Sequence, residues 1–155
     1  MKLPESTEWV LHAAGSLAQL DAGVTASAGQ LAEHFDVPPA YLAKQLQTLV
    51  RAGVLIATTG PRGGFRLARA PEEISLLQIV EALDGTSRFY RCNELRQRGR
   101  AAAPPEQCRK ICGIANHMYA AEAAWRASLA AVTLADIVAG LPRGVPQRTR
   151  ALLAR

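Results

Sequence analysis

The stretch 38–70 contains no acidic residue, although the whole chain has 13. Its basic residues are Lys44, Arg51, Arg62, Arg66 and Arg69. In the first half of the stretch, leucine and valine recur at the spacing of one helix face, and polar residues occupy the opposite face. In the second half, two short strand-like runs flank a glycine-rich loop at 60–64. A helix followed directly by a basic hairpin predicts a winged helix-turn-helix, a fold that is mainly α with a small β wing.

The polar face of this helix and the tip of the hairpin predict a surface for double-stranded DNA. Glutamine and lysine contact base edges in the major groove, so the candidate reading residues are Tyr41, Lys44, Gln45 and Thr48. We expect Arg62, at the hairpin tip, to enter the adjacent minor groove. Gly63 and Gly64 are expected to let the backbone approach DNA closely. The alternative is a solvated basic face without a partner.

The remaining pattern divides the chain into four parts. A first helix is predicted over 4–20, a second follows a capping Ser27, and a fourth ends at Gly85. The expected parts are a winged helix-turn-helix domain at 1–85, a loop at 86–113 that holds all three cysteines, a long helix with a short C-terminal helix at 114–141, and a flexible basic tail at 142–155.

The long alanine-rich helix predicted after the loop carries an apolar stripe. The stripe consists of Met118, Ala121, Trp125, Leu129 and Val132. A stripe of this kind must be buried, and a second copy of the chain is the economical partner, which predicts a two-fold homodimer. Packing of the stripe against its own domain is the alternative.

Composition and cysteine usage exclude several classes of protein. No apolar run approaches the length of a bilayer span, and the charged N-terminal residues do not form a signal peptide, so no membrane partner is expected. Three cysteines, an odd number, argue against a disulfide scaffold and for a reducing cytoplasm. No pairing of a nucleophile with a base is evident, so we do not expect an enzyme. The prediction is a cytoplasmic DNA-binding protein.

Cys108 and Cys112 are four residues apart, among basic neighbours that favour thiolates. Thiolates bind iron–sulfur clusters, but a cluster needs four ligands and the only further cysteine is Cys92. Glu8 and His12 are also four apart and can chelate one metal from a single helix face. They can equally be an exposed acid–histidine pair. Zinc is the competing metal, because two cysteines, a histidine and a carboxylate suit a tetrahedral site.

Four segments of the chain resemble the bacterial winged-helix iron–sulfur regulators that include IscR and NsrR. The segments are Tyr41–Leu46, Arg51–Leu55, Gly60–Ala68 and Pro71–Leu76. The similarity runs from the first residue to about Val138. It implies a homodimer whose long helices cross between subunits. It also implies an iron–sulfur cluster, held in the loop before that helix, whose state controls operator binding.

Within this family, the chain is similar to the redox-sensing branch typified by RsrR. In that branch the matching glutamate and histidine ligate a 2Fe–2S cluster and come from the other subunit than the cysteine pair. The resemblance therefore implies a site made of Cys108 and Cys112 of one chain with Glu8 and His12 of its partner. Two other residues are not among the four ligands that the resemblance implies. Cys92 is left as a non-ligand, while His117 is an alternative nitrogen ligand that lacks the spacing of IscR-like proteins.

A histidine ligand generally raises the reduction potential of a cluster above that of all-cysteine ligation. The expected function is therefore a dimeric regulator that senses redox state. Trp9, next to Glu8, is a candidate redox relay that reorients with the charge of the cluster, or else a core aromatic. The alternatives are the same fold sensing nitric oxide or iron status, and a winged-helix repressor that is cofactor-free or zinc-bound.

Overall fold

The computed structural model describes residues 3–61 and 63–153. The chain divides into two units, which are described one at a time. One unit comprises the residues up to Gly85 together with those from Leu129 onward, and the other comprises residues 86–128. The first unit contains the predicted helix-turn-helix and wing.

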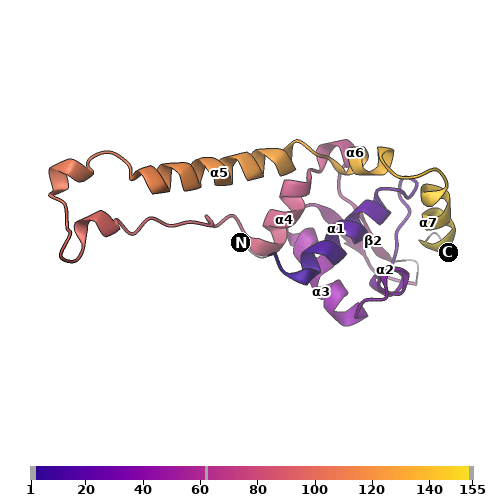
Figure 1. Ribbon diagram of the computed structural model, residues 1–155. Helices are drawn as coiled ribbons and strands as arrows, with labels where there is room; N and C mark the ends of the chain where they lie inside the picture. The colour runs from indigo at the N-terminus through magenta and orange to yellow at the C-terminus, as the bar shows by residue number, and fades with distance from the viewer. Residues whose placement is uncertain (1–2, 62, 154–155) are drawn as a thin grey trace. The chain divides into compact units, whose positions relative to one another are not determined.

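Three helices open the first unit, namely α1 (Glu5–Leu17), α2 (Ala28–Phe35) and α3 (Pro39–Arg51) (Figure 1). α1 ends three residues before its predicted end. The Gln19 amide donates to the carbonyl of Ser16, three residues earlier, at 3.1 Å, and this 3-10 pattern replaces the four-residue pattern of an α-helix. Ser27 caps α2 as predicted. Its hydroxyl accepts from the Gln30 amide at 3.1 Å, and the Gln30 side chain accepts from the Ser27 amide at 2.8 Å.

The wing follows α3 directly. Gly53 adopts a φ of 71° after the helix, a conformation that glycine reaches without strain. Strands β1 (Leu55–Thr58) and β2 (Gly64–Leu67) then pair antiparallel, with Leu55 opposite Leu67. These elements confirm the predicted fold class, mainly α with a two-stranded wing.

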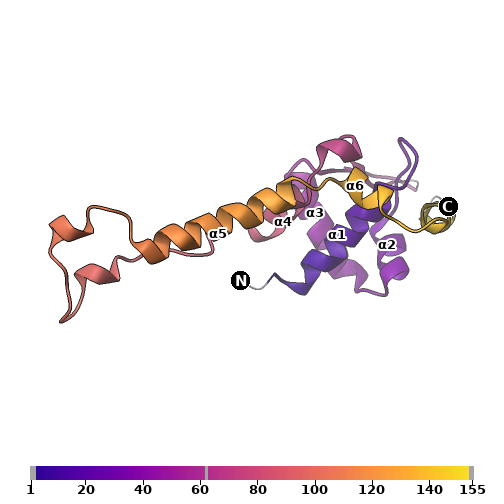
Figure 2. The ribbon, with the colours of Figure 1, turned by 45° about the horizontal axis from the view of Figure 1, so that its top comes forward.

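The first unit is completed by the short 3-10 turn η1 (Pro71–Glu73), by α4 (Leu76–Asp84) and by α6 (Leu134–Ala139). The chain returns from residue 129 onward beside the start of α4, where the Leu76 amide donates to the Val132 carbonyl at 2.9 Å. Figure 2 shows α6 lying beside α1 in this unit. Leu134 of α6 is buried in the core of this unit.

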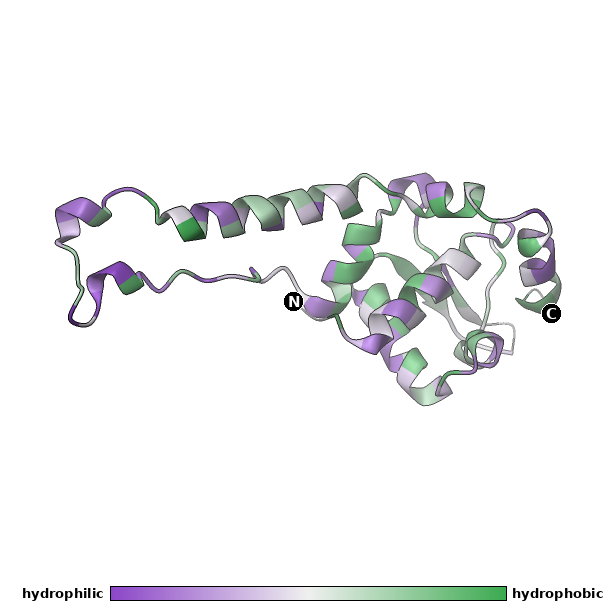
Figure 3. Ribbon diagram, viewed as in Figure 1, coloured by the Kyte–Doolittle hydropathy of each residue, from purple (hydrophilic) through white to green (hydrophobic). Residues whose placement is uncertain are grey.

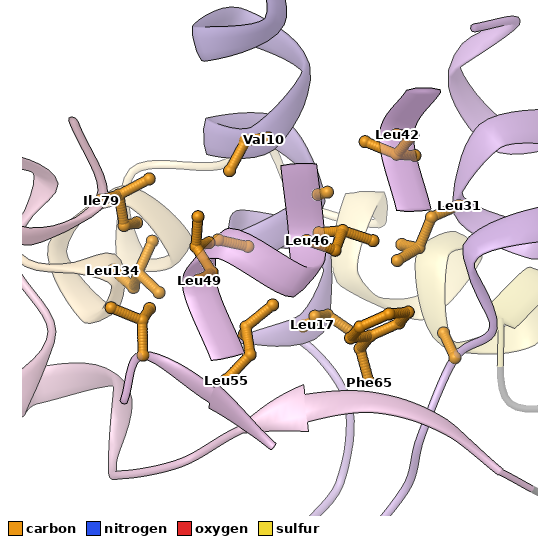
Figure 4. Close-up of a cluster of buried hydrophobic side chains, with 14 of the residues drawn as sticks. Val10, Leu17, Leu31, Leu42, Leu46, Leu49, Leu55, Phe65, Ile79 and Leu134 are labelled. Atoms are coloured by element: carbon orange, nitrogen blue, oxygen red, sulfur yellow. The ribbon is translucent and has the colours of Figure 1, made fainter. Parts of the chain in front are cut away.

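A single hydrophobic core joins the elements of the first unit (Figure 4). Its largest contributors are leucines on the inner face of α3, which pack with residues of α1, β1, β2, α4 and α6. These buried residues are Val10, Leu17, Leu42, Leu46, Leu49, Leu55, Phe65, Ile79 and Leu134. The leucine face predicted from helical spacing is therefore the inner face of α3.

The second unit consists of an irregular loop and most of α5 (Gly113–Ala130). The loop contains two 3-10 turns, η2 (Leu95–Gln97) and η3 (Pro105–Cys108). Its first part runs along α5, because the ring of Phe89 meets that of Trp125 edge-on with centroids 4.6 Å apart. α5 begins one residue before the long helix predicted from residue 114.

The apolar stripe of α5 is only partly covered within its own chain. Phe89 packs on Trp125, whereas Ile114 is 68% exposed and Met118 is 42% exposed. Figure 3 shows hydrophobic and hydrophilic residues alternating along this helix. Among the described residues, no helix combines the length and the apolar character needed to cross a bilayer.

The prediction of a flexible tail at 142–155 is wrong for most of that range. Residues Val145–Leu153 form a further helix, α7, which packs on the first unit. Leu153 is buried in the core, and the Arg150 guanidinium donates to the Gln19 carbonyl at 3.0 Å. The tail looks polar as a sequence, but its leucine and arginine, with the buried Thr149 and the bond from the Gln30 side-chain amide to the Leu153 carbonyl, anchor it to distant residues.

We expect Leu153→Ala to lower the free energy of unfolding by about 2–5 kcal/mol, because it leaves a cavity in a packed core. Leu152→Ala is the matched control, since Leu152 is 49% exposed and its truncation is expected to change stability by less than about 0.5 kcal/mol. Urea denaturation followed by circular dichroism measures both values. Equal losses in the two variants would contradict the docking of α7.

Candidate nucleic-acid interface and metal ligands

α3 presents its predicted reading residues on the face opposite the buried leucines. Tyr41 is 45% exposed, Lys44 is exposed, and Gln45 and Thr48 are half-buried. The Thr48 hydroxyl accepts from the Arg51 guanidinium at 2.9 Å, which extends the polar face to the last turn. The structure therefore brings these residues together on one accessible face of a helix.

The wing lies next to α3 along the chain, but its two predicted glycines have a structural task of their own. Of the predicted wing contacts, Arg62 lies outside the described residues. A Cβ on Gly64 would lie 2.6 Å from the Ala26 carbonyl oxygen, and a Cβ on Gly63 would overlap the Thr58 carbonyl. Glycine is required at position 64 because the wing backbone packs against the backbone of residue 26, and at position 63 because the hairpin folds back on its own backbone at Thr58.

A pair of backbone hydrogen bonds explains this close approach. The Phe65 amide donates to the Ala26 carbonyl at 2.8 Å, and the Ala26 amide donates to the Phe65 carbonyl at 3.1 Å. Ala26, which precedes α2, thus forms an antiparallel β-bridge with Phe65 of β2. This bridge fixes the wing to the body of the first unit.

Glu8 and His12, the predicted ligands on α1, are both exposed. They lie one turn apart on the same helix. The His12 ring contacts Phe35 of α2, with centroids 5.5 Å apart. The carboxylate and the imidazole are thus accessible to a metal.

Trp9, between these two residues, is half-buried and faces α3. Its ring meets that of Tyr41 edge-on, with centroids 5.6 Å apart and planes at 83°. Aromatic pairs prefer this geometry. A predicted ligand helix and a predicted reading residue are therefore in direct contact through Trp9.

A largely apolar cavity of about 350 Å³ lies beside His12 within the first unit. α1, α2, α6 and α7 contribute its walls, and Gly15 lies in the α1 wall. A Cβ on Gly15 would meet no atom within 4 Å. The cavity therefore leaves room for small side chains at this point of α1.

Cys108 and Cys112 lie in the second unit, at the end of η3 and just before α5. Both are free and half-buried, as is Cys92. The Arg96 guanidinium holds the segment between the two cysteines, since its Nη2 donates to the Lys110 carbonyl at 2.9 Å. Arg96 also makes two bonds to the Glu94 carboxylate, of 2.6 and 2.8 Å.

The electrostatics of the loop centre on these same groups. The hydrogen bond from Arg96 lowers the pKa of Glu94. That bond also raises the pKa of Arg96, with smaller contributions from the charges of Cys108 and Cys112. Desolvation raises the pKa of Tyr90, and the nearby Cys92 and Cys112 add to this increase. Arg96 therefore lies within electrostatic range of both predicted thiolate ligands.

The four predicted ligands fall into two pairs. Glu8 and His12 belong to the first unit, and Cys108 and Cys112 belong to the second. Within the described part of a single chain, no three histidine, cysteine, aspartate or glutamate side chains gather as a metal site. The sequence interpretation missed Arg96 as the centre of the loop, because its bond to Lys110 spans 14 residues and leaves no local pattern.

Residues 3–140 match the Rrf2 family model, whose description is iron-dependent transcriptional regulator. The protein slr0846 of Synechocystis sp. is 46% identical over 85 residues, which cover 54% of this chain and 57% of that protein. The transcriptional regulator IscR of Cereibacter sphaeroides is 35% identical over 71 residues, which cover 46% of each chain. The chain thus spans about half the length of these two relatives.

A longer match and two solved structures extend the likeness. The transcriptional regulator NsrR of Bacillus subtilis is 26% identical over 138 residues, which cover 89% of this chain and 90% of that protein. The structure of CymR, the global cysteine regulator of B. subtilis, superposes with a TM-score of 0.71 at 19% identity, covering 92% of this chain and 99% of that one. The structure of T. potens IscR superposes with a TM-score of 0.68 at 21% identity, covering 93% of this chain and 94% of that one. At these identities the two structures bear on the fold, and they confirm it.

We expect Gly64→Ala to lower the free energy of unfolding by about 1–3 kcal/mol, because the new Cβ overlaps the backbone of Ala26. Gly15→Ala is the matched control. It places a better helix former in α1 where space is open, and is expected to raise stability by about 0.5–1 kcal/mol. Thermal and urea unfolding of both variants test this. An unchanged stability of Gly64→Ala would show that the glycine serves only an outside partner.

Proposed function

We propose that this chain, which belongs to the Rrf2 family of transcriptional regulators, binds duplex DNA as a homodimer and couples binding to the redox state of a 2Fe–2S cluster. The family is one of regulators and not of enzymes. The observation that carries the DNA-binding part is the outer face of α3. It exposes Tyr41 and Lys44 beside the wing, in a stretch without acidic residues to repel phosphates.

In this proposal α3 enters the major groove and the wing reaches the adjacent minor groove. Lys44 and Gln45 suit base edges, while Arg51 and Arg66 suit phosphates, which position a protein without specifying sequence. A homodimer presents two such units to a partly palindromic operator. The exposed Ile114 and Met118 on α5 support dimerisation, since large apolar side chains in a row favour burial by a partner.

The donor set of the chain suits an iron–sulfur cluster. Cys108 and Cys112 offer two free thiols from one short segment, and Glu8 and His12 offer a carboxylate and an imidazole from one helix face. We assign the thiols of one chain and the α1 pair of its partner as the four ligands. When bound, such a cluster supplies one-electron redox chemistry at a potential raised by its histidine ligand.

Trp9 provides a route from these ligands to DNA. It follows Glu8 directly, and its ring rests on Tyr41 of the reading helix. A small rotation of α1 at the metal site therefore changes the support under Tyr41. A coupling free energy of about 1–3 kcal/mol, typical of allosteric sites, changes operator affinity by about 5- to 150-fold.

The description of the family model as iron-dependent favours a second candidate, the sensing of iron status through the same ligands. In that case the loss of the metal, and not a change in its charge, alters DNA binding. Nitric oxide sensing by the same cluster, and a zinc-bound or cofactor-free repressor, are further outcomes that the tests below separate.

Substitutions on α3 test the DNA-binding face. We expect Arg51→Ala, on the last turn of α3, to weaken binding similarly on all sequences and to reduce the slope of log affinity against log salt by about one unit, because the proposal places Arg51 on a phosphate. Gln45→Ala is expected to relax specificity at one base position and to leave the salt slope unchanged. Titrations of operator and unrelated duplexes at several salt concentrations measure both effects. Binding that is unaffected in both variants would refute the role of this face.

The cluster assignment is tested by substituting each cysteine in turn. Cys108→Ser and Cys112→Ser are expected to lose iron, sulfide and visible absorption, and Glu8→Ala and His12→Ala to lower iron content. Cys92→Ser is the matched control and is expected to keep all three signals. The measurement is an anaerobic visible spectrum with iron and sulfide assays. Equal loss of iron in the Cys92 variant would contradict the assignment. A colourless wild-type protein that contains zinc would show that zinc, and not a cluster, is the cofactor.

The sensing step is tested on one operator at fixed salt. Oxidised, reduced and cluster-free protein are expected to differ in affinity by about 5- to 150-fold. A difference between the oxidised and reduced forms supports redox sensing. A difference only on removal of the cluster supports iron sensing. Equal affinities of all three forms would leave a regulator without this sensing function.

A further inference from the structure

We infer that Arg96 is a positioning residue that holds Cys108 and Cys112 in the arrangement needed to bind one metal together. The inference rests on the proposed cluster site, because it concerns the thiols assigned to it. It adds a residue that touches neither the metal nor DNA. The argument draws only on contacts within the second unit.

Arg96 is fixed first at its guanidinium. Nε and Nη2 meet the two oxygens of Glu94 at 2.6 and 2.8 Å, a bidentate geometry that sets the plane of the group. Glu94 adopts a φ of 50°, and among the described non-glycine residues only Asp36 shares a positive φ. Asp36 ends α2, where this conformation is common, but Glu94 ends no α-helix. The strained backbone at Glu94 is what aims its carboxylate at Arg96.

Arg96 also binds the segment between the two cysteines. Nη2 donates to the carbonyl of Lys110, which lies midway between Cys108 and Cys112 in sequence. The Arg96 carbonyl accepts from the Ala103 amide at 2.7 Å. The other backbone hydrogen bonds described within 94–110 join residues no more than three positions apart. The Arg96 side chain therefore supplies the long-range hydrogen bond to the segment between the two cysteines.

The charge of Arg96 adds to this geometry. Its guanidinium lies within electrostatic range of both Cys108 and Cys112. Two thiolates that bind one metal repel each other, and a fixed cation beside both offsets that repulsion. Only arginine combines this charge with a planar fork that bonds a carboxylate and a carbonyl at once.

The test uses full-length cluster-free protein under anaerobic conditions, with cobalt(II) as the probe. Thiolate-to-cobalt absorption reports how many thiolates bind the metal. Arg96→Gln and Arg96→Lys are both expected to weaken cobalt binding by about 10- to 100-fold, the usual effect of removing a residue that orients metal ligands. Both variants are also expected to lower the thiolate absorption at saturation. Arg98→Gln is the matched control, an exposed arginine of the same loop, and should match wild type.

The outcomes separate this inference from the proposed function. If wild type binds cobalt through thiolates and Arg96→Gln binds it equally well, the positioning role is wrong while the cysteine site stands. Wild-type behaviour of Arg96→Lys also overturns the role, because charge alone would then suffice. If wild-type protein shows no thiolate absorption with cobalt and carries no iron, the cluster site itself fails.

Glu94→Gly is a further control, which separates the loss of the Arg96 contact from a general loss of structure in the arginine variants. It removes the carboxylate but suits the left-handed backbone at that position. We expect it to weaken cobalt binding as Arg96→Gln does, with the helical circular dichroism of wild type retained. A Glu94→Gly variant with wild-type cobalt affinity would overturn the inference.

Discussion

The burial of one leucine face on α3 is the constraint on which the first unit depends. Leu42, Leu46 and Leu49 are fully buried. Burying a leucine side chain stabilises a fold by about 1.5–3 kcal/mol, so these three residues fix the rotation of the helix about its axis. That rotation turns the polar face outward. Gly53 follows the helix with a positive φ, and the wing begins directly after it.

The same core also fixes α1. Val10, Ala13 and Leu17 point inward, so the opposite side of α1 carries Glu8 and His12, and Trp9 lies at the boundary against Tyr41. The proposed ligand helix and the reading helix are thus packed on one core. Packed cores deform little, and Trp9 joins α1 to Tyr41 of α3 by direct contact. This arrangement makes a coupling between metal and DNA physically reasonable.

The cysteine loop is organised differently. Its large apolar side chains Leu95 and Ile111 are 73% and 57% exposed, and polar bonds around Arg96 hold it in place of a core. Segments with few buried apolar contacts open at low free-energy cost. Such a loop can rearrange around a metal or a partner chain, whereas the first unit keeps its shape. The two units therefore differ in rigidity because they differ in packing.

The sequence alone determined the helix-turn-helix, the wing, the cap of α2 and the candidate ligands, because each depends on residues within a few positions of one another. The Ser27–Gln30 box and the stop at Gly53 are of this kind. Tertiary structure decided the docking of α7 through Leu153, the contact of Trp9 with Tyr41, and the tie from Arg96 to Lys110. It also showed that Gly64 packs against Ala26. These contacts join residues far apart in the chain, and no periodicity or local motif records which distant partner a side chain meets.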